Sequence, residues 1–268
     1  MKINMEFLKI VKKRSFISEL LYKVLNIVFA ITILIIVLVT EYLVPAFALV
    51  LLSKWRVFAV RPRYWFANVQ TNLVDFIVSV GFVIFLSTIA EAEPQRLIIQ
   101  IILTLLYIVW LLVIKPRSRR VYVLIQAGVA LFIGVAALFS VAYTWPASLV
   151  VLSMWLIGYS TARHVLSSYD EERHIMFLSL VWGLVMAELG WIAYHWTIAY
   201  SLPVIEGASL PQVSIISFCL AFLMYKAYNS YVHYQKVRFN DIVLPLIFAI
   251  SVISVLLLVF NTVGTGSL

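Results

Sequence analysis

Charged residues are unusually scarce in this chain. Asp, Glu, Lys and Arg make up 12% of its 268 residues, about half the share in an average soluble domain, and the mean hydropathy is +1.04. No stretch between apolar runs is polar enough or long enough to fold as a separate soluble domain. The composition therefore predicts one membrane-embedded unit.

Cysteine and the familiar catalytic motifs are also lacking. Cys219 is the only cysteine, so no intrachain disulfide can form. The sequence has no Walker loop, Gly-x-Gly-x-x-Gly, Cys-x-x-Cys, His-Glu-x-x-His or Gly-x-Ser-x-Gly. The four histidines fall at different depths without metal-ligand spacing, so we expect no metal and no cofactor. An Asn-x-Ser/Thr sequon is missing too, which is compatible with a prokaryotic cytoplasmic membrane.

What charge there is has a strong sign. The net charge is +8, and the basic residues form clusters beside apolar runs. Such clusters orient helices with the positive side inside and attract anionic lipid head groups. No basic stripe with interleaved exposed aromatics is present, so nucleic acid is not an expected partner. The expected partner is the anionic cytoplasmic face of a bilayer.

The apolar runs predict an all-α integral membrane protein, a polytopic bundle of about nine transmembrane helices. A basic cytoplasmic segment, 1–16, precedes a single transmembrane domain, 17–268. The predicted spans are 17–40, 42–60, 68–90, 97–114, 121–143, 147–162, 175–199, 212–232 and 242–260. A competing interpretation makes 17–60 one kinked helix, which gives eight spans.

Loop charges set the orientation of these spans. The N-terminus is predicted to be cytoplasmic and the C-terminus outside. With this topology all but two of the 20 lysines and arginines lie on the inner side. Arg96 is the one outside, and Lys226 is the one within the membrane. The reverse orientation would place the other 18 residues outside, against the positive-inside rule.

Three ionisable residues, Asp75, Glu188 and Lys226, lie well inside predicted spans. At about 1.5 Å per residue, Asp75 and Lys226 are both roughly 10 Å from the inner surface. Opposite charges at one depth in a membrane are expected to pair. Gln126 falls at a similar level, so the inner half is predicted to hold one polar set.

The outer half holds a second set, centred on the apolar run 175–199. Glu188 shares a helix face with His195, while Gly183, Ala187 and Gly190 lie on a nearly opposite face. Small residues let another helix approach closely. We therefore expect this helix to be internal, with protein on both sides.

The two sets together form the candidate intramembrane polar site. Gln100 matches His195 in depth, and Tyr107 and Tyr159 roughly match Glu188. The site residues are Glu188, His195, Gln100, Tyr107, Tyr159, Asp75, Lys226 and Gln126.

Three functions fit this pattern. The leading one is a transport-like role, in which both polar sets line a path for a small solute or for proton coupling. The second is a non-catalytic membrane subunit or scaffold, whose internal polar residues fix packing while it holds another membrane protein. The third is an enzyme acting on a lipid-linked substrate at the outer face. It would use residues among Glu41, Glu91, Glu93, Arg96, Glu206 and His195.

Overall fold

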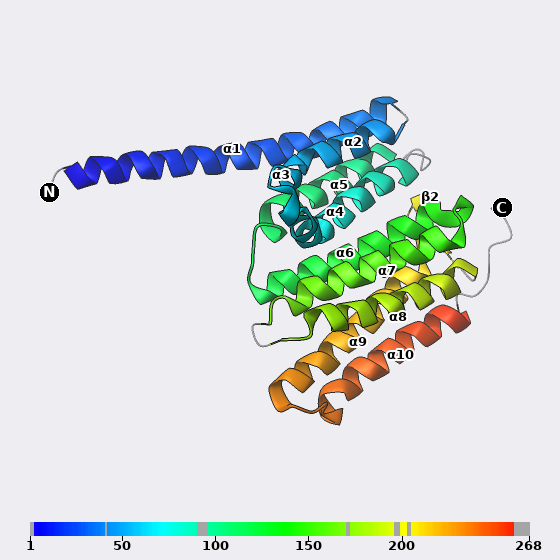
Figure 1. The fold of residues 1–268 in the computed structure, drawn as a ribbon. Helices are drawn as coiled ribbons and strands as arrows, with labels where there is room; N and C mark the ends of the chain where they lie inside the picture. Colours follow the sequence, from blue (N-terminus) through cyan, green and yellow to red (C-terminus); the bar gives the residue numbers. More distant parts are fainter. Residues whose placement is uncertain are drawn as a thin grey trace.

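The computed structural model is a bundle of long helices, and from α4 onward successive long helices run in opposite directions (Figure 1). The structure describes residues 3–40, 42–89, 96–169, 172–195, 199–202 and 205–259. Within these ranges, eight helices are long and apolar enough to cross a membrane. The predicted all-α polytopic bundle is thereby confirmed, and the chain is a multi-pass helical membrane protein.

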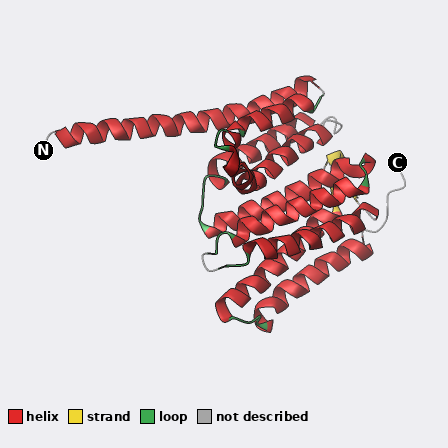
Figure 2. Cartoon of the chain, viewed as in Figure 1, coloured by secondary structure: helices red, strands yellow, loops and turns green. Residues whose placement is uncertain are grey.

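Helix accounts for most of the described chain, and the strands form one small hairpin (Figure 2). The α-helices are α1 (Ile3–Thr40), α2 (Val44–Ser53), α3 (Trp55–Phe58), α4 (Trp65–Thr88), α5 (Arg96–Val109), α6 (Arg120–Val141), α7 (Ala147–Leu166), α8 (Ile175–His195), α9 (Gln212–Tyr234) and α10 (Phe239–Val259). Short 3-10 turns at Pro62–Tyr64 and Ala142–Thr144 adjoin α4 and α6, and α5 continues into a π-helix, η3 (Trp110–Ile114).

The first part of the chain differs from both predictions for 17–60. α1 ends at Thr40 and α2 turns back beside it, so the segment is not one kinked helix. The returning segment is not a full span either, because α2 has only 10 residues and α3 only 4. At 1.5 Å per residue, α2 rises about 15 Å, roughly half the hydrocarbon thickness. Pro45 lies in the first turn of α2, where proline is tolerated.

The centre of the bundle is formed by α4, α6 and α7. α4 contacts α6 and α7, and it also contacts α1, α2 and α5. Large side chains such as Phe139, Leu131 and Met154 are fully buried here. α4 therefore joins the N-terminal helices to the helices that follow, which explains why a polar residue on α4 can meet partners from several elements.

Helices α7 and α8 make the most extensive contact of any helix pair. A Cβ added at Gly158 of α7 would lie 2.6 Å from Met186 Cγ, and one added at Gly190 of α8 would lie 2.6 Å from Met154 Cγ. The backbones approach this closely only because these positions carry no side chain. The predicted packing face at Gly183, Ala187 and Gly190 is therefore confirmed, with α7 as its partner.

The segment between α8 and α9 also differs from the prediction. α8 ends at His195, not at 199, and the segment before the next predicted span contains the antiparallel strands β1 (Ala199–Leu202) and β2 (Ile205–Pro211). Pro146 and Pro211 directly precede α7 and α9, where a fixed φ and a missing N–H are tolerated. The hairpin lies at the opposite end of the bundle from the N-terminus (Figure 1).

Candidate functional site

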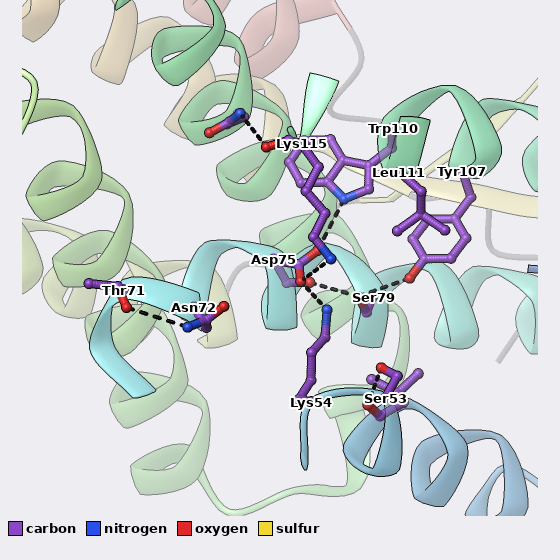
Figure 3. Close-up of polar contacts among 12 residues, drawn as sticks. Ser53, Lys54, Thr71, Asn72, Asp75, Ser79, Tyr107, Trp110, Leu111 and Lys115 are labelled. Atoms are coloured by element: carbon purple, nitrogen blue, oxygen red, sulfur yellow. Dashed lines mark hydrogen bonds and ion pairs between the residues drawn. The ribbon is translucent and has the colours of Figure 1, made fainter. Parts of the chain in front are cut away.

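Asp75 of α4 is the centre of a buried charged cluster (Figure 3). Its Oδ2 atom forms ion pairs with two ammonium groups, that of Lys54 and, at 2.8 Å, that of Lys115. Its Oδ1 atom accepts a long hydrogen bond of 3.4 Å from the indole Nε1 of Trp110. We call Lys54, Asp75 and Lys115 the charged triad. Its members come from three elements that are far apart in the sequence.

The π-helix η3 presents Trp110 and Lys115 to Asp75. On a regular α-helix, residues five apart point about 140° away from each other. The wider turn is closed by a hydrogen bond from the Lys115 N–H to the Trp110 carbonyl, at 2.9 Å. Both side chains can then reach the same carboxylate. Isolated π turns are frequent at functional sites, because they re-aim side chains in this way.

The end of η3 is held by an amide from another helix. The Nε2 of Gln126 on α6 donates to the carbonyls of Ile114 and Arg117 at 2.7 and 3.0 Å, and to that of Lys115 at 3.3 Å. The Gln126 Oε1 lies 2.7 Å from the Nε2 of His164, so we assign the ring proton to this nitrogen. Carbonyls that have no partner within their own helix are satisfied by this side chain. Gln126 is thus a positioning residue for Lys115.

A second polar contact joins α4 and α5 next to the triad. Tyr107 donates from its hydroxyl to Ser79 Oγ at 2.9 Å, and Ser79 donates to the Asp75 backbone carbonyl at 2.7 Å. The Tyr107 ring stacks on Phe82, with ring centroids 4.1 Å apart. These contacts fix the turn of α4 that carries Asp75.

The triad carries an unbalanced charge. It contains two ammonium groups and one carboxylate, and among the described residues Asp75 is the only carboxylate paired with either lysine. The side chains of Lys54 and Asp75 are 11% and 12% exposed, whereas that of Lys115 is 32% exposed. The cluster is therefore enclosed on the Lys54 side and accessible at Lys115.

The predicted pairing of Asp75 with Lys226 is wrong. Asp75 is neutralised by Lys54 and Lys115, while the Lys226 ammonium lies 5.6 Å from the Phe222 ring centroid on its own helix, α9. Equal depth did not make them partners, because α4 and α9 are not among the closely packed helix pairs.

The remaining inner and middle residues have local roles. Tyr107 and Gln126 adjoin the triad, as described above. Gln100 donates to the Leu86 carbonyl at 2.8 Å and thereby ties α5 to α4. Tyr159 accepts hydrogen bonds from Gln70 and, at 3.3 Å, from Arg163.

Glu188 and His195 are not part of the interior. Both side chains are exposed on α8, along with Leu184 and Trp191 on the same face. The prediction that this helix has protein on both sides is therefore wrong for the face that bears the acid. The glycine face alone is covered. Glu188 lies seven residues from the end of α8, about 10 Å along the helix.

Lys54, Lys115, Trp110 and Ser79 were missed as site residues. Lys54 lies in the predicted span 42–60, and Lys115 directly follows the predicted span 97–114, among the basic residues that flank apolar runs. The sequence offered one signal for the two lysines, because a buried acid such as Asp75 needs a cation nearby. Of the residues proposed for an outer-face enzyme, Glu41, Glu91 and Glu93 lie outside the described residues, as does the side chain of Glu206. Arg96 begins α5 and His195 ends α8.

The described residues contain no group of three or more His, Cys, Asp or Glu side chains that could hold a metal ion. Comparison with known proteins adds no assignment: no family model, no curated protein and no solved structure matches this chain. Any function must be argued from the charged triad and from the exposed face of α8.

Proposed function

We propose that this protein is a non-catalytic membrane subunit that works as part of an intramembrane assembly, and that it binds a second copy of itself along α8. One observation carries the proposal: an ionisable side chain, Glu188, is exposed in the middle of a membrane span. An acid facing lipid at this depth costs several kcal/mol unless it is protonated, paired or hydrogen-bonded. A partner helix over Glu188 removes that cost.

The spacing of exposed residues on α8 supports a helix partner. Successive residues of one exposed row are four, three, four, three and four positions apart, which is the heptad period of left-handed helix pairs. We call this row the α8 seam. It consists of Phe177, Val181, Leu184, Glu188, Trp191 and His195. A polar residue within such a seam favours one register over others.

A second copy is the occupant that fits the seam best. Copies inserted in the same orientation pair their α8 helices in parallel about a twofold axis, so Glu188 faces its counterpart at the same depth. Two neutral carboxyl groups there can hydrogen-bond to each other. Lys226 of a second copy does not match, because it lies eight residues from the inner end of its helix and Glu188 lies 13. The difference is about 8 Å along the membrane normal.

A transport path has less support from the contacts. Glu188 and His195 lie on α8, which packs mainly on α7, whereas Gln100 and Tyr107 lie on α5, which packs on α1 and α4. The outer polar set is thus divided between two surfaces. A path through it would have to cross the packed interior between α5 and α8, which favours the subunit over the transporter.

Cysteine crosslinking in proteoliposomes tests the dimer. In a Cys219→Ser background, we expect Leu184→Cys on the α8 seam to give a disulfide-linked dimer under mild oxidation. Leu105→Cys is the matched control, because it is similarly exposed on α5 at a comparable depth. Equal crosslinking at both positions would mean random collision and would overturn the proposal.

Two substitutions at Glu188 identify the type of contact. Glu188→Leu removes the interhelical hydrogen bond and should weaken dimerisation about 3- to 30-fold. Glu188→Gln keeps a neutral hydrogen-bonding group and should preserve the dimer. If Glu188→Gln instead dissociates the dimer, a neutral amide cannot replace the acid, and the proposed hydrogen bond between the two carboxyl groups is wrong. Single-molecule photobleaching in lipid bilayers measures both.

A further inference from the structure

The charged triad has one more positive charge than its own residues neutralise. Two ammonium groups converge on Asp75 Oδ2, and no other carboxylate pairs with either lysine within the described part of the chain. Like charges this close repel strongly where water is scarce, and a partly buried excess cation is costly in a membrane protein. The arrangement becomes balanced when an anion binds beside the two ammonium groups.

We propose that the triad binds a phosphate group presented from the inner side of the membrane, either on an anionic lipid head group or as free phosphate. This site goes beyond the assembly role and does not depend on it. Each ammonium has three N–H donors, and a phosphate has several oxygens that can accept from both lysines at once. Lysine binds phosphate as a point charge and needs no planar geometry.

Access to the triad is from the end of the bundle that carries the basic loops. Lys115 directly follows the span Arg96–Ile114, its side chain is about one third exposed, and Pro116, Arg117, Ser118 and Arg119 after it are exposed. Lys54 approaches from the other side, at the break between α2 and α3 (Figure 3). A lipid phosphate in the inner head-group layer can reach Lys115 without entering the apolar core.

The site is also pre-organised. Gln126 and its partner His164 hold the backbone at Lys115, and the π turn directs that residue toward Asp75. The lysine therefore loses less conformational freedom on binding than one on a mobile loop. This distinguishes Lys115 from Arg119, which is exposed four residues further on and supplies only general surface charge.

Asp75 has a defined role in this proposal, because it competes with the ligand for both ammonium groups. The carboxylate holds the lysines together while the site is empty and lowers the affinity for an anion. Removing its charge without changing its shape should therefore strengthen binding. This expectation separates a phosphate site from a salt bridge that only stabilises helix packing.

Native mass spectrometry of the purified full chain in neutral detergent micelles tests the site. The probes are phosphatidic acid, phosphatidylcholine and inorganic phosphate, titrated separately. Lys115→Gln should lower phosphatidic acid affinity more than about tenfold, as expected for a lost charge-assisted hydrogen bond. Arg119→Gln should lower it less than about fivefold. Asp75→Asn should raise it.

Each arm has an outcome that decides the matter. Binding of phosphatidic acid but not inorganic phosphate assigns the site to a lipid, and Lys115-dependent binding of both assigns it to phosphate in general. Equal losses for Lys115→Gln and Arg119→Gln would mean general surface attraction and would overturn the proposal. So would an Asp75→Asn variant that elutes as a folded protein without a gain in affinity. Lys54→Gln provides a second test from the enclosed side and should match Lys115→Gln.

Discussion

Asp75 neutralises charge from two points of the chain that are 61 positions apart, at Lys54 and Lys115. Lys54, which is only 11% exposed, would not be tolerated at its depth alone, since an unpaired ammonium in an apolar environment carries a large desolvation penalty. The same carboxylate thus allows a short apolar helix, α2, to end inside the bundle and α5 to finish next to α4. One residue determines how three elements meet.

Removing the acid should therefore be more harmful than removing the whole triad. We expect Asp75→Leu to lower the free energy of unfolding by about 3–5 kcal/mol, because it leaves two lysines without a counter-charge. The triple variant Lys54→Met, Asp75→Leu, Lys115→Met should recover most of this loss, since buried charges replaced together by apolar groups cost little. Denaturation in mixed micelles measures both. A triple variant no more stable than Asp75→Leu would contradict this account.

The sequence predicted that Asp75 is buried and paired, but it did not predict the partner. Depth can be counted along a helix, so Asp75 and Gln126 were expected at neighbouring levels, and both contact the segment that ends at Lys115. Tyr107 was expected in the outer set with Glu188, but it bonds to Ser79, one turn from Asp75. Which helices are adjacent depends on tertiary packing, and depth alone cannot distinguish Lys226 from Lys54. The exposed position of Glu188 was missed for a related reason. A glycine face indicates that one neighbour packs closely, but it says nothing about the opposite face.

At the scale of elements, the π-helix η3 connects local structure to the site. It replaces the last turn of α5, and its irregular carbonyls are satisfied from other helices. Gln126 donates to those of Ile114 and Lys115, and Tyr22 of α1 donates to that of Leu111 at 3.4 Å. Without these outside donors the segment would favour ordinary α-helical bonding, in which Lys115 points away from Trp110. The π turn is thus a product of tertiary contacts.

Gln126→Leu tests that dependence. It leaves three carbonyls without their amide donor, so we expect a loss of about 1–3 kcal/mol in the free energy of unfolding. Hydrogen exchange should also become faster at residues 110–118. Ser140→Ala is the control on the same helix, because Ser140 bonds only to the Ala136 carbonyl of its own helix. If both variants exchange alike in that segment, Gln126 does not hold the π turn.

The long spans were predictable because continuous apolar runs need only length and composition to identify them. The π turn, the short helix α2 and the hairpin β1–β2 were not, because each depends on contacts with other parts of the chain. Pro45 marked the start of α2, but nothing in the apolar run 42–60 indicated the break at Ser53, where Lys54 turns toward Asp75. The local sequence marked where α2 begins, whereas contacts with other helices determine where it ends.

At the scale of the whole molecule, the short passage through α2 and α3 decides the topology. If this passage crosses the bundle, residues before α2 and after α3 lie on opposite sides, and α4 begins on the inner side. α2 and α3 together are shorter than a usual span, so the crossing depends on Lys54 being neutralised below the surface by Asp75. The positive-inside rule then places the loop at Ser118 inside and the turn at Thr144 outside.

Site-directed labelling tests this topology. In the Cys219→Ser background, single cysteines replace Tyr42, Arg61, Ser118 and Thr144, all of which are exposed. A membrane-impermeant maleimide applied to intact cells should label Tyr42→Cys and Thr144→Cys. Arg61→Cys and Ser118→Cys should react only after permeabilisation. The Tyr42 and Arg61 pair isolates the short passage, because both would react from one side if α2 and α3 only dipped into the membrane and returned. Ser118 and Thr144, at the two ends of α6, are the control pair, because a full-length helix separates them.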